Sequence, residues 1–163
     1  MPSVGYGIPY IDRKCIETLF QFLSIDNIIL LFKRVLLDTS NLFISEKSGR
    51  LVDCCEAIKS LIFPFKYEQV YIPNLPEGLR DRVDCPYIFM MGMVKDEYVK
   101  TKDSIKDGTY IIDIDKDYIF QVPHTSITLK RTGTNKNIAS EDLPDLPSTL
   151  LKRLKKEIEG YSK

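Results

Sequence analysis

The sequence contains one histidine, His124, no tryptophan, and no excess of either charge, since 23 Lys and Arg residues balance 23 Asp and Glu residues. A general nucleic-acid binder would carry a basic excess, so we expect no nucleic-acid partner. No apolar run approaches the roughly 18 residues of a membrane span. The first residues also lack the basic and apolar regions of a secretory signal. These absences predict a cytoplasmic protein whose membrane association is at most peripheral.

Cysteine is sparse, and its spacing does not suit a metal centre. The four cysteines, Cys15, Cys54, Cys55 and Cys85, form no C-x-x-C pair. A structural zinc site needs about four ligands at close paired spacing, and the chain has one histidine to add to them. In a protein without a secretory signal, reduced thiols are the default. We therefore expect these cysteines to be small core or surface residues with no metal role.

An alternating acidic run, Asp113, Asp115 and Asp117, has the pattern of a calcium-binding loop. An EF-hand loop needs a glycine at its sixth position and an acid at its twelfth. Counted from Asp113, those positions hold Tyr118 and His124. The run therefore predicts carboxylates at strand ends, which cap turns or accept backbone hydrogen bonds, and no metal site.

Motifs for covalent or cofactor chemistry are also absent. The sequence has no G-x-G-x-x-G, no G-x-x-x-x-G-K-[ST] and no G-x-S-x-G. The histidine lies between Pro123 and Thr125 in a segment without regular patterning, which is typical of a solvated side chain. We expect no cofactor, and we expect a recognition surface rather than an enzyme. An enzyme acting on a small molecule is the weakest alternative, because it would lack both a phosphate loop and a nucleophile elbow.

Short apolar runs alternate with helical patterns from about residue 25 to residue 122. Helical periodicity occurs near residues 16–23, 24–36, 51–63 and 76–83, and strand-like runs occur near residues 42–44, 69–73, 87–93, 109–114 and 118–122. This alternation predicts an α/β fold with a mostly parallel central sheet of about five strands and helices on both faces. The turn between the last two strands is too short for a parallel crossover, so we expect that pair to be antiparallel.

Several positions in this pattern carry specific expectations. Ser24 is typical of a residue that caps the helix following it. Gly92, within an apolar run, indicates a bulge or a close approach of another backbone segment. Residues 123–149 are expected to form a loop-rich connection to a C-terminal helix that Ser148 caps. We expect the basic side of that helix to be solvated, with contact to acidic lipid or nucleic acid as the alternative. Its basic residues are Lys152, Arg153, Lys155 and Lys156.

The segment from Leu23 to Asp115 resembles the central segment of a DENN domain. The blocks that carry the resemblance are, in order, LSIDNIILLFKRVLLDTSNLFIS from residue 23, LIFPF at 61–65, VYIPNLP at 70–76, an apolar run containing Gly92, and DID at 113–115. Each block is short, but their order and spacing together are specific to the family. Tyr67 stands where the family usually has tryptophan, so the chain resembles a divergent member.

The resemblance implies a guanine nucleotide exchange factor module for Rab-type small GTPases, acting in membrane trafficking. In that family an upstream longin-like lobe and this central α/β lobe, completed by downstream helices, hold the switch regions of the GTPase. Residues 1–163 would then be a single central DENN domain within a larger protein, recruited to vesicle or endosomal membranes. A DENN-like interaction scaffold without exchange activity is the alternative interpretation.

The resemblance also implies a contact surface at the rim where strands meet the helices that follow them. The candidate GTPase-binding residues on this rim are Leu75, Pro76, Arg80, Asp81, Lys95, Asp96, Glu97, Asp113 and Asp115. Turn geometry explains Pro76 at least as well as contact does, and we expect Lys95, Asp96 and Glu97 to lie in a loop. Asp113 and Asp115 either orient loops or face the GTPase.

Overall fold

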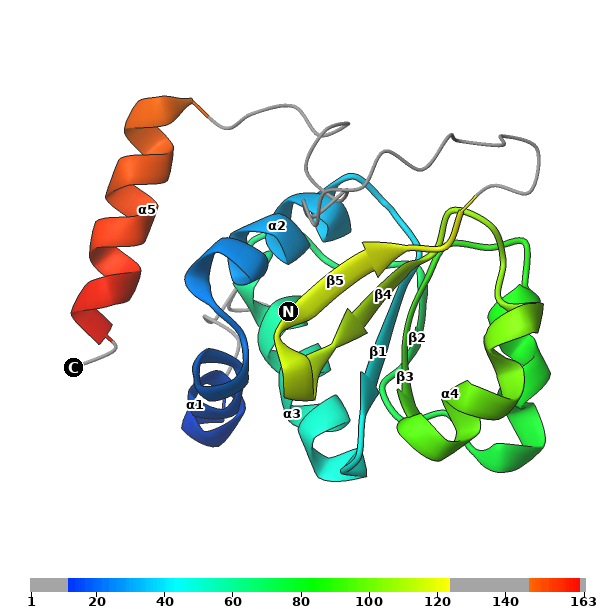
Figure 1. Ribbon diagram of the computed structural model, residues 1–163. Coiled ribbons are helices and arrows are strands. Elements are labelled where there is room, and N and C mark those ends of the chain that lie inside the picture. The colour runs from blue at the N-terminus through cyan, green and yellow to red at the C-terminus, as the bar shows by residue number, and fades with distance from the viewer. Residues whose placement is uncertain (1–11, 124–146, 162–163) are drawn as a thin grey trace, which may run out of the picture.

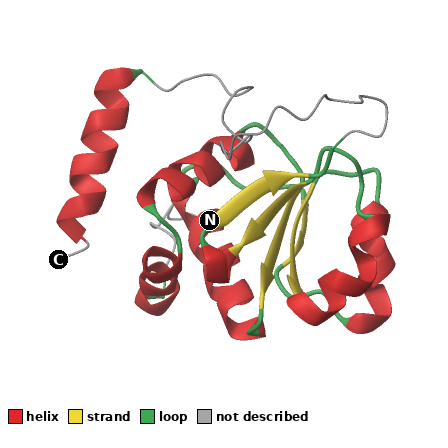
Figure 2. Ribbon diagram, viewed as in Figure 1, coloured by secondary structure: helices red, strands yellow, loops and turns green. Residues whose placement is uncertain are grey.

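The computed structural model describes residues 12–123 and 147–161. The helices are α1 (Arg13–Phe22), α2 (Ile25–Leu36), α3 (Ser48–Leu61), α4 (Lys95–Thr101) and α5 (Ser148–Tyr161). The strands are β1 (Asn41–Ser45), β2 (Val70–Ile72), β3 (Phe89–Val94), β4 (Tyr110–Asp113) and β5 (Tyr118–Gln121). Short 3-10 segments lie in the connections and are η1 (Glu77–Asp84), η2 (Lys102–Ser104) and η3 (Ile114–Lys116). Figure 1 labels the helices and strands, and Figure 2 colours them by type.

The strands form one sheet with the order β2-β3-β1-β4-β5. β2, β3, β1 and β4 run parallel, and β5 pairs with β4 in the antiparallel direction. The mostly parallel sheet and the antiparallel final pair are both confirmed as predicted. The short turn at η3 permits only an antiparallel return, because a parallel crossover needs about a dozen residues or more.

Helices cover both faces of the sheet, which confirms the predicted α/β architecture (Figure 1). On one face, the buried side chains of Phe43 and Ile112 belong to a core that includes residues of α1, α2 and α3. On the other face, Leu42 and Ile111 belong to a second core with Val83 of η1, and α4 packs on that side. Successive residues of each strand therefore point to opposite cores, as the pleat of a strand requires.

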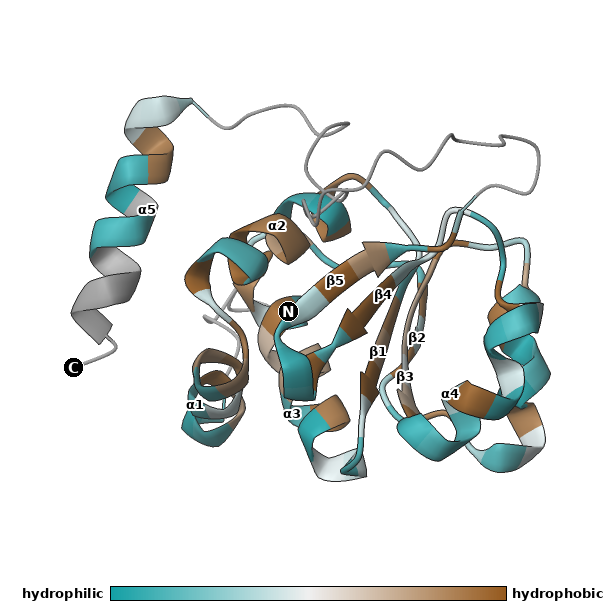
Figure 3. Ribbon diagram, in the orientation of Figure 1, coloured by the Kyte–Doolittle hydropathy of each residue, from teal (hydrophilic) through white to brown (hydrophobic). Residues whose placement is uncertain are grey.

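The central strand β1 is buried along its whole length. A strand that is covered on both faces can present apolar side chains in both directions, so its apolar residues need not alternate with polar ones. This explains the continuous apolar run at residues 42–44. In Figure 3 the central strands are predominantly hydrophobic, while the helices carry both hydrophilic and hydrophobic residues.

Gly92 lies where the chain that leaves β2 passes over β3. A Cβ atom added to Gly92 would lie 2.1 Å from the carbonyl oxygen of Pro73. The Leu75 N–H donates a hydrogen bond to the Gly92 carbonyl oxygen at 2.7 Å. The predicted close backbone approach is therefore confirmed, and it places the Leu75–Pro76 segment beside β3.

Two local predictions need correction. The segment holding Lys95, Asp96 and Glu97, predicted as a loop, is the first turn of α4. This helix has 7 residues, which is less than two full turns, so hydrophobic periodicity cannot reveal it. α3 begins at Ser48 rather than near residue 51. Its first turn is polar and mostly exposed, and apolar spacing gives no signal there.

Ser24 occupies the N-cap position of α2, as predicted, but its side chain makes no capping hydrogen bond. Asp117 supplies the acceptor, because its Oδ1 accepts from the Ser24 N–H at 2.9 Å and from Asn27 Nδ2 at 2.8 Å. Asp117 has a φ of 49°, a left-handed conformation in which Asp is enriched. The start of α2 is thus fixed by the turn between β4 and β5.

Most of the connection predicted at residues 123–149 lies outside the described residues. α5 is present where the C-terminal helix was predicted, but Ser148, predicted as its cap, is the first residue of the helix. Lys155 forms an ion pair with Asp26 of α2 at 2.5 Å. In the ranges 12–123 and 147–161, no single helix has the length and apolar character needed to cross a membrane. α1 and α2 taken together reach that length and composition, but they are bent by 116° where they meet.

Candidate functional site

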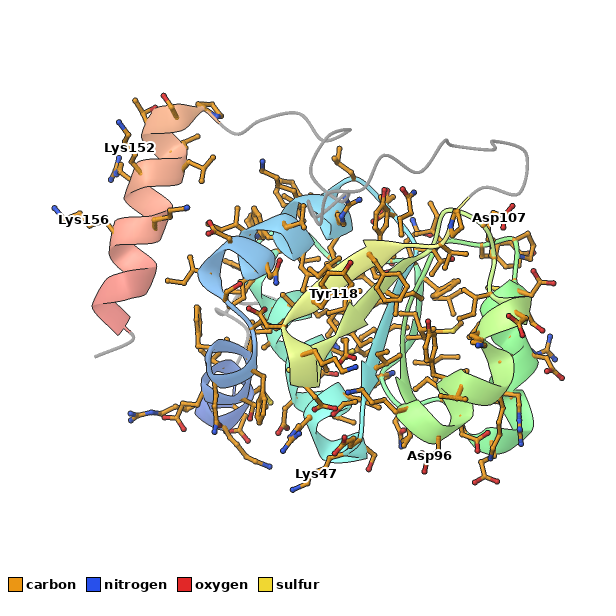
Figure 4. All side chains as sticks on the ribbon, viewed as in Figure 1. Lys47, Asp96, Asp107, Tyr118, Lys152 and Lys156 are labelled. Carbon is orange, nitrogen blue, oxygen red and sulfur yellow. The ribbon has the colours of Figure 1, made fainter. Side chains whose placement is uncertain are left out.

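The parallel strands all end at one edge of the sheet, which we name the carboxyl edge. β1 continues into α3 on one face, whereas its neighbour β3 continues into α4 on the other face. α/β proteins usually bind ligands at such a reversal, because the two connections diverge and leave a crevice beyond the strand ends. Lys47, which follows β1, and Asp96, which follows β3, lie at this edge in Figure 4.

Asp115, just past β4, joins the segments that leave the carboxyl edge. Its carboxylate accepts hydrogen bonds from Ser45 Oγ at 2.8 Å, from the Glu46 N–H at 2.8 Å and from Arg50 Nη1 at 2.7 Å. Lys95 Nζ lies 2.9 Å from the same carboxylate. The start of α3 and the start of α4 are therefore both tied to the end of β4.

Lys95 bridges two carboxylates in this cluster. Its Nζ lies 2.9 Å from Asp113 Oδ1 and 2.9 Å from Asp115 Oδ2. The exposed fractions of the side chains are 20% for Lys95, 9% for Asp113 and 12% for Asp115. Removing one partner of such a shielded cluster would leave an uncompensated charge, which is the costly outcome for buried ion pairs. The charges of the cluster are compensated within the protein itself.

Hydrogen bonds determine the charge states of Asp115 and Lys95 in the same cluster. Burial alone would raise the pKa of Asp115, but the hydrogen bonds from Lys95 and the neighbouring donors outweigh burial and hold the pKa well below its ordinary value. For Lys95, burial acts to lower the pKa, and hydrogen bonds to Asp113 and Asp115 overcome it and raise the pKa. Both groups are therefore charged at neutral pH, and the ion pair is fully formed there.

A pocket of about 410 Å³ opens at the carboxyl edge, between the start of α3, the connection from β2 to η1, and α4. Its lining residues are Ser48, Asn74, Leu75, Pro76, Glu77, Val94, Asp96, Glu97 and Lys100. Leu75, Pro76 and Val94 give it an apolar part. The exposed carboxylates of Glu77 and Asp96 have no hydrogen bond or ion pair with any residue that the structure describes.

Glu97 is the buried acid of the pocket, with an exposed fraction of 9%. Its carboxylate lies 2.5 Å from Lys100 Nζ and 3.1 Å from Arg80 Nη1. The hydrogen bond from Lys100 lowers the pKa of Glu97, and the charge of Arg80 acts in the same direction against the effect of burial. These contacts hold η1 against α4, so one wall of the pocket is a fixed structure.

The candidate residues on η1 and α4 differ in their exposure. Pro76 and Asp96 are exposed and line the pocket, and Asp81 is exposed on η1 outside the lining. Arg80 is partly exposed and is paired with Glu97. The remaining candidates are largely buried. Leu75 belongs to the second core with an exposed fraction of 5%, and Lys95, Asp113 and Asp115 form the ion cluster.

The sequence prediction missed some of the pocket residues, namely Ser48, Asn74, Glu77, Val94 and Lys100. Asn74 and Glu77 flank the predicted Leu-Pro pair, so a wider window around that block would have included them. Lys100 lies one turn after Glu97 on a helix that the sequence pattern did not reveal. Ser48 carries no local signal, because only the pairing of β1 with β3 brings it to this edge.

Neither thiol chemistry nor metal binding is indicated for the residues that the structure describes at the carboxyl edge. Burial raises the pKa of Cys54 to about 12, and burial also raises the pKa of the fully buried Cys55. A thiol with a raised pKa is a poor nucleophile at neutral pH. In the described ranges, no three His, Cys, Asp or Glu side chains gather in a way that could hold a metal ion. The carboxyl edge instead presents a shaped and charged surface.

Comparison with known proteins finds one protein family along this chain. The model of the DENN (AEX-3) domain matches residues 6–117. The matched range contains every candidate residue of the carboxyl edge.

Curated proteins show the same similarity. The DENN domain and WD repeat-containing protein SCD1 of Arabidopsis thaliana is 32% identical over 152 residues, which cover 93% of this chain and 11% of that protein. The DENN domain-containing protein 2B of Homo sapiens is 28% identical over 125 residues, which cover 76% of this chain and 11% of that protein. The elicitor of plant defense protein 1 of Verticillium dahliae is 33% identical over 104 residues, covering 64% and 9%. The chain thus spans about a tenth of the length of these curated relatives.

Proposed function

The chain belongs to the DENN domain family, and we propose on this basis that it is the core lobe of a module that binds a Rab-type small GTPase and promotes exchange of GDP for GTP. DENN proteins are regulatory factors generally tied to Rab exchange. The observation that carries the proposal is the carboxyl edge, where partly buried ion pairs hold a preformed rim of exposed side chains. The activity would serve membrane trafficking on vesicle or endosomal surfaces.

The mechanism that we propose works through differential binding. The module binds the nucleotide-free conformation of the GTPase more tightly than the nucleotide-bound one. By thermodynamic linkage, a protein that prefers the empty GTPase weakens the affinity of that GTPase for nucleotide by the same factor. Exchange by this mechanism needs no covalent step, so it depends on a rigid contact surface on the module. The Lys95 cluster supports this proposal, because it connects the segments that carry the rim.

The burial of the candidate residues divides their proposed roles. Pro76, Asp81 and Asp96 are exposed and can touch a partner directly. Arg80 lies beside them and is held by Glu97. The buried candidates act through position: Leu75 anchors the connection after β2, and Lys95, Asp113 and Asp115 orient the segments after β1, β3 and β4.

The opposite edge of the sheet, where the parallel strands begin, supports the proposal that further segments of the protein complete the module. Exposed apolar side chains lie in the chain segments that lead into three adjacent parallel strands: Leu36 and Leu37 come before β1, Phe63 and Phe65 before β2, and Tyr87 before β3. The exposed fractions of Phe65 and Tyr87 are 67% and 68%. Aromatic side chains exposed in this way are typical of an interface. We propose that downstream DENN helices cover this edge and that an upstream longin-like lobe contributes to the GTPase site.

The charged side of α5 allows at most a peripheral contact with membranes. Lys152 and Lys156 point away from the rest of the molecule in Figure 4, and Lys155 is engaged by Asp26. A few exposed lysines would give only weak attraction to an anionic membrane, about 1 kcal/mol each near the surface. In our proposal, membrane recruitment therefore comes from the bound GTPase and from other parts of the protein.

Release of fluorescent GDP from a panel of Rab proteins tests the proposed function. The assay compares the 163-residue chain with a longer polypeptide that includes upstream and downstream DENN segments. We expect the longer polypeptide to accelerate release from at least one Rab, and the 163-residue chain to act weakly. Equal binding to the GDP-bound, GTP-bound and empty GTPase would instead identify a scaffold, and failure to accelerate release from any Rab would refute the exchange activity.

A further inference from the structure

The pocket at the carboxyl edge combines an apolar part with unpaired negative charge. Leu75, Pro76 and Val94 line it, and the carboxylates of Glu77 and Asp96 stand exposed around it. Neither carboxylate has a partner among the residues that the structure describes. The exposed acids lie on different elements, η1 and α4, so both sides of the opening carry negative charge.

The cations near the pocket are already engaged by Glu97. Lys100 and Arg80 both pair with its carboxylate. Arg80 Nη1 lies 3.1 Å from the buried Oε2 of Glu97, although this contact lacks hydrogen-bond geometry. The one lysine in the pocket lining, Lys100, therefore does not compensate the charges of Glu77 and Asp96.

We propose that this pocket receives one lysine or arginine side chain of the bound GTPase. The proposal rests on the function proposed above and names the contact that the pocket makes in it. A long basic side chain has an apolar stem and a cationic head, which match the Leu75–Pro76 wall and the carboxylates of Glu77 and Asp96.

Other occupants fit the pocket less well. An anionic group would meet Glu77 and Asp96, and the one lysine in the lining, Lys100, is neutralised by Glu97. An apolar side chain would remove water from the two carboxylates without replacing its hydrogen bonds, which costs free energy. A volume of about 410 Å³ is at the small end of the range for ligand pockets, about 300–1,000 Å³. Such a pocket holds one long side chain together with some water.

The test uses the whole protein and the Rab that responds in the exchange assay. The Glu77→Gln/Asp96→Asn double variant removes both exposed charges with almost no change in shape. The matched control is Asp84→Asn/Asp103→Asn, which removes two exposed charges that lie outside the pocket lining and whose side chains have no hydrogen bond or ion pair with the described residues. Binding of the nucleotide-free GTPase is measured at several salt concentrations, and thermal unfolding shows that both variants remain folded.

We expect the pocket variant to bind about tenfold more weakly, mainly through slower association, with a smaller dependence on salt. The control variant should bind like the wild type. Glutamine substitutions at each surface lysine and arginine of the GTPase should then reveal one that weakens binding to the wild type and not to the pocket variant.

The outcomes separate the two proposals. If the wild type accelerates GDP release but the pocket variant binds equally well, or if no basic residue of the GTPase couples to the pocket, the pocket assignment is wrong and the exchange function stands. If the wild type acts on no Rab, the proposed function fails and the pocket assignment falls with it.

Discussion

The guanidinium carbon of Arg34, at the end of α2, lies 3.3 Å from the centre of the Tyr110 ring, at the start of β4. Arg34 has an exposed fraction of 2%, so water screens this cation–π contact very little. The stacked pair joins a helix of the first core to a strand of the sheet. It also lies at the edge where the parallel strands begin, far along the strands from the ion cluster of Lys95.

The contact predicts a specific response to substitution of Tyr110. Tyr110→Leu removes the ring and should lower the free energy of unfolding by about 2 kcal/mol, through lost packing and the lost interaction with the buried cation. Tyr110→Phe keeps the ring and should change it by less than about 0.5 kcal/mol. Urea unfolding followed by circular dichroism measures both. A large loss in the phenylalanine variant would show that the hydroxyl, and not the ring, matters.

Gly92→Ala should be strongly destabilising, because the new Cβ would lie 2.1 Å from the Pro73 carbonyl oxygen and 3.1 Å from Leu51 Cβ. The backbone on both sides is fixed by the sheet, so we expect a loss of about 3 kcal/mol or a failure to fold. Gly49→Ala is the matched control, since nothing lies within 4 Å of its added Cβ. Chemical unfolding of the two variants compares them, and similar stabilities would contradict the close approach.

Asp115→Asn should destabilise the protein by about 3 kcal/mol, because it leaves the largely buried Lys95 and Arg50 with less compensating charge. The segments after β1 and β3 should also loosen, which amide hydrogen exchange at Glu46 and Asp96 would detect. Asp84→Asn, at an exposed position without ion pairs to the described residues, serves as the control. Unchanged exchange at both segments in Asp115→Asn would argue against a positioning role for Asp115.

The stability of the protein should depend on pH in the acid range through the same carboxylate. The pKa of Asp115 is lower in the folded protein than its ordinary value of 3.8. The unfolded chain therefore binds a proton more readily, and the contribution of Asp115 is present above about pH 4 and is lost as the pH falls through the folded pKa. Unfolding free energies measured from pH 7 down to pH 2 should fall less steeply below pH 4 in Asp115→Asn than in the wild type.

The cysteines should differ in reactivity. Burial raises the pKa of Cys54 to about 12 and raises that of Cys55 as well, so both thiols should react with a disulfide reagent only after unfolding. Cys85 is half-buried and should react first in the native protein. Burial and the nearby Asp53 raise the pKa of Cys15, so Cys15 should follow more slowly. Mass spectrometry of a timed modification at pH 8 gives the order, and early modification of Cys54 would contradict the packing of α3.

Hydrophobic patterning predicted most of the fold because it is a local property of the chain. Continuous apolar runs marked β1 and β3, the helical spacing of α2 was visible, and the short turn before β5 required an antiparallel pair. α4 was not predicted from the sequence, because 7 residues are too few to show a helical period. Ser24 was correctly placed at a helix start, yet its acceptor comes from Asp117, which lies 93 residues later in the chain.

The same distinction between local sequence pattern and tertiary contact applies to the candidate site. Its residues could be picked from short blocks, since Leu75, Pro76 and the Asp113–Asp115 pair lie within recognisable segments. The contacts of these residues could not be predicted from the short blocks. Lys95 pairs with Asp115, and Arg80 pairs with Glu97, only after parallel strand pairing brings separate connections to one edge. Local patterns thus determine which elements form and which residues end them. Burial, ion pairing and the shape of the pocket arise from distances between segments remote in the chain, and folding alone sets those distances.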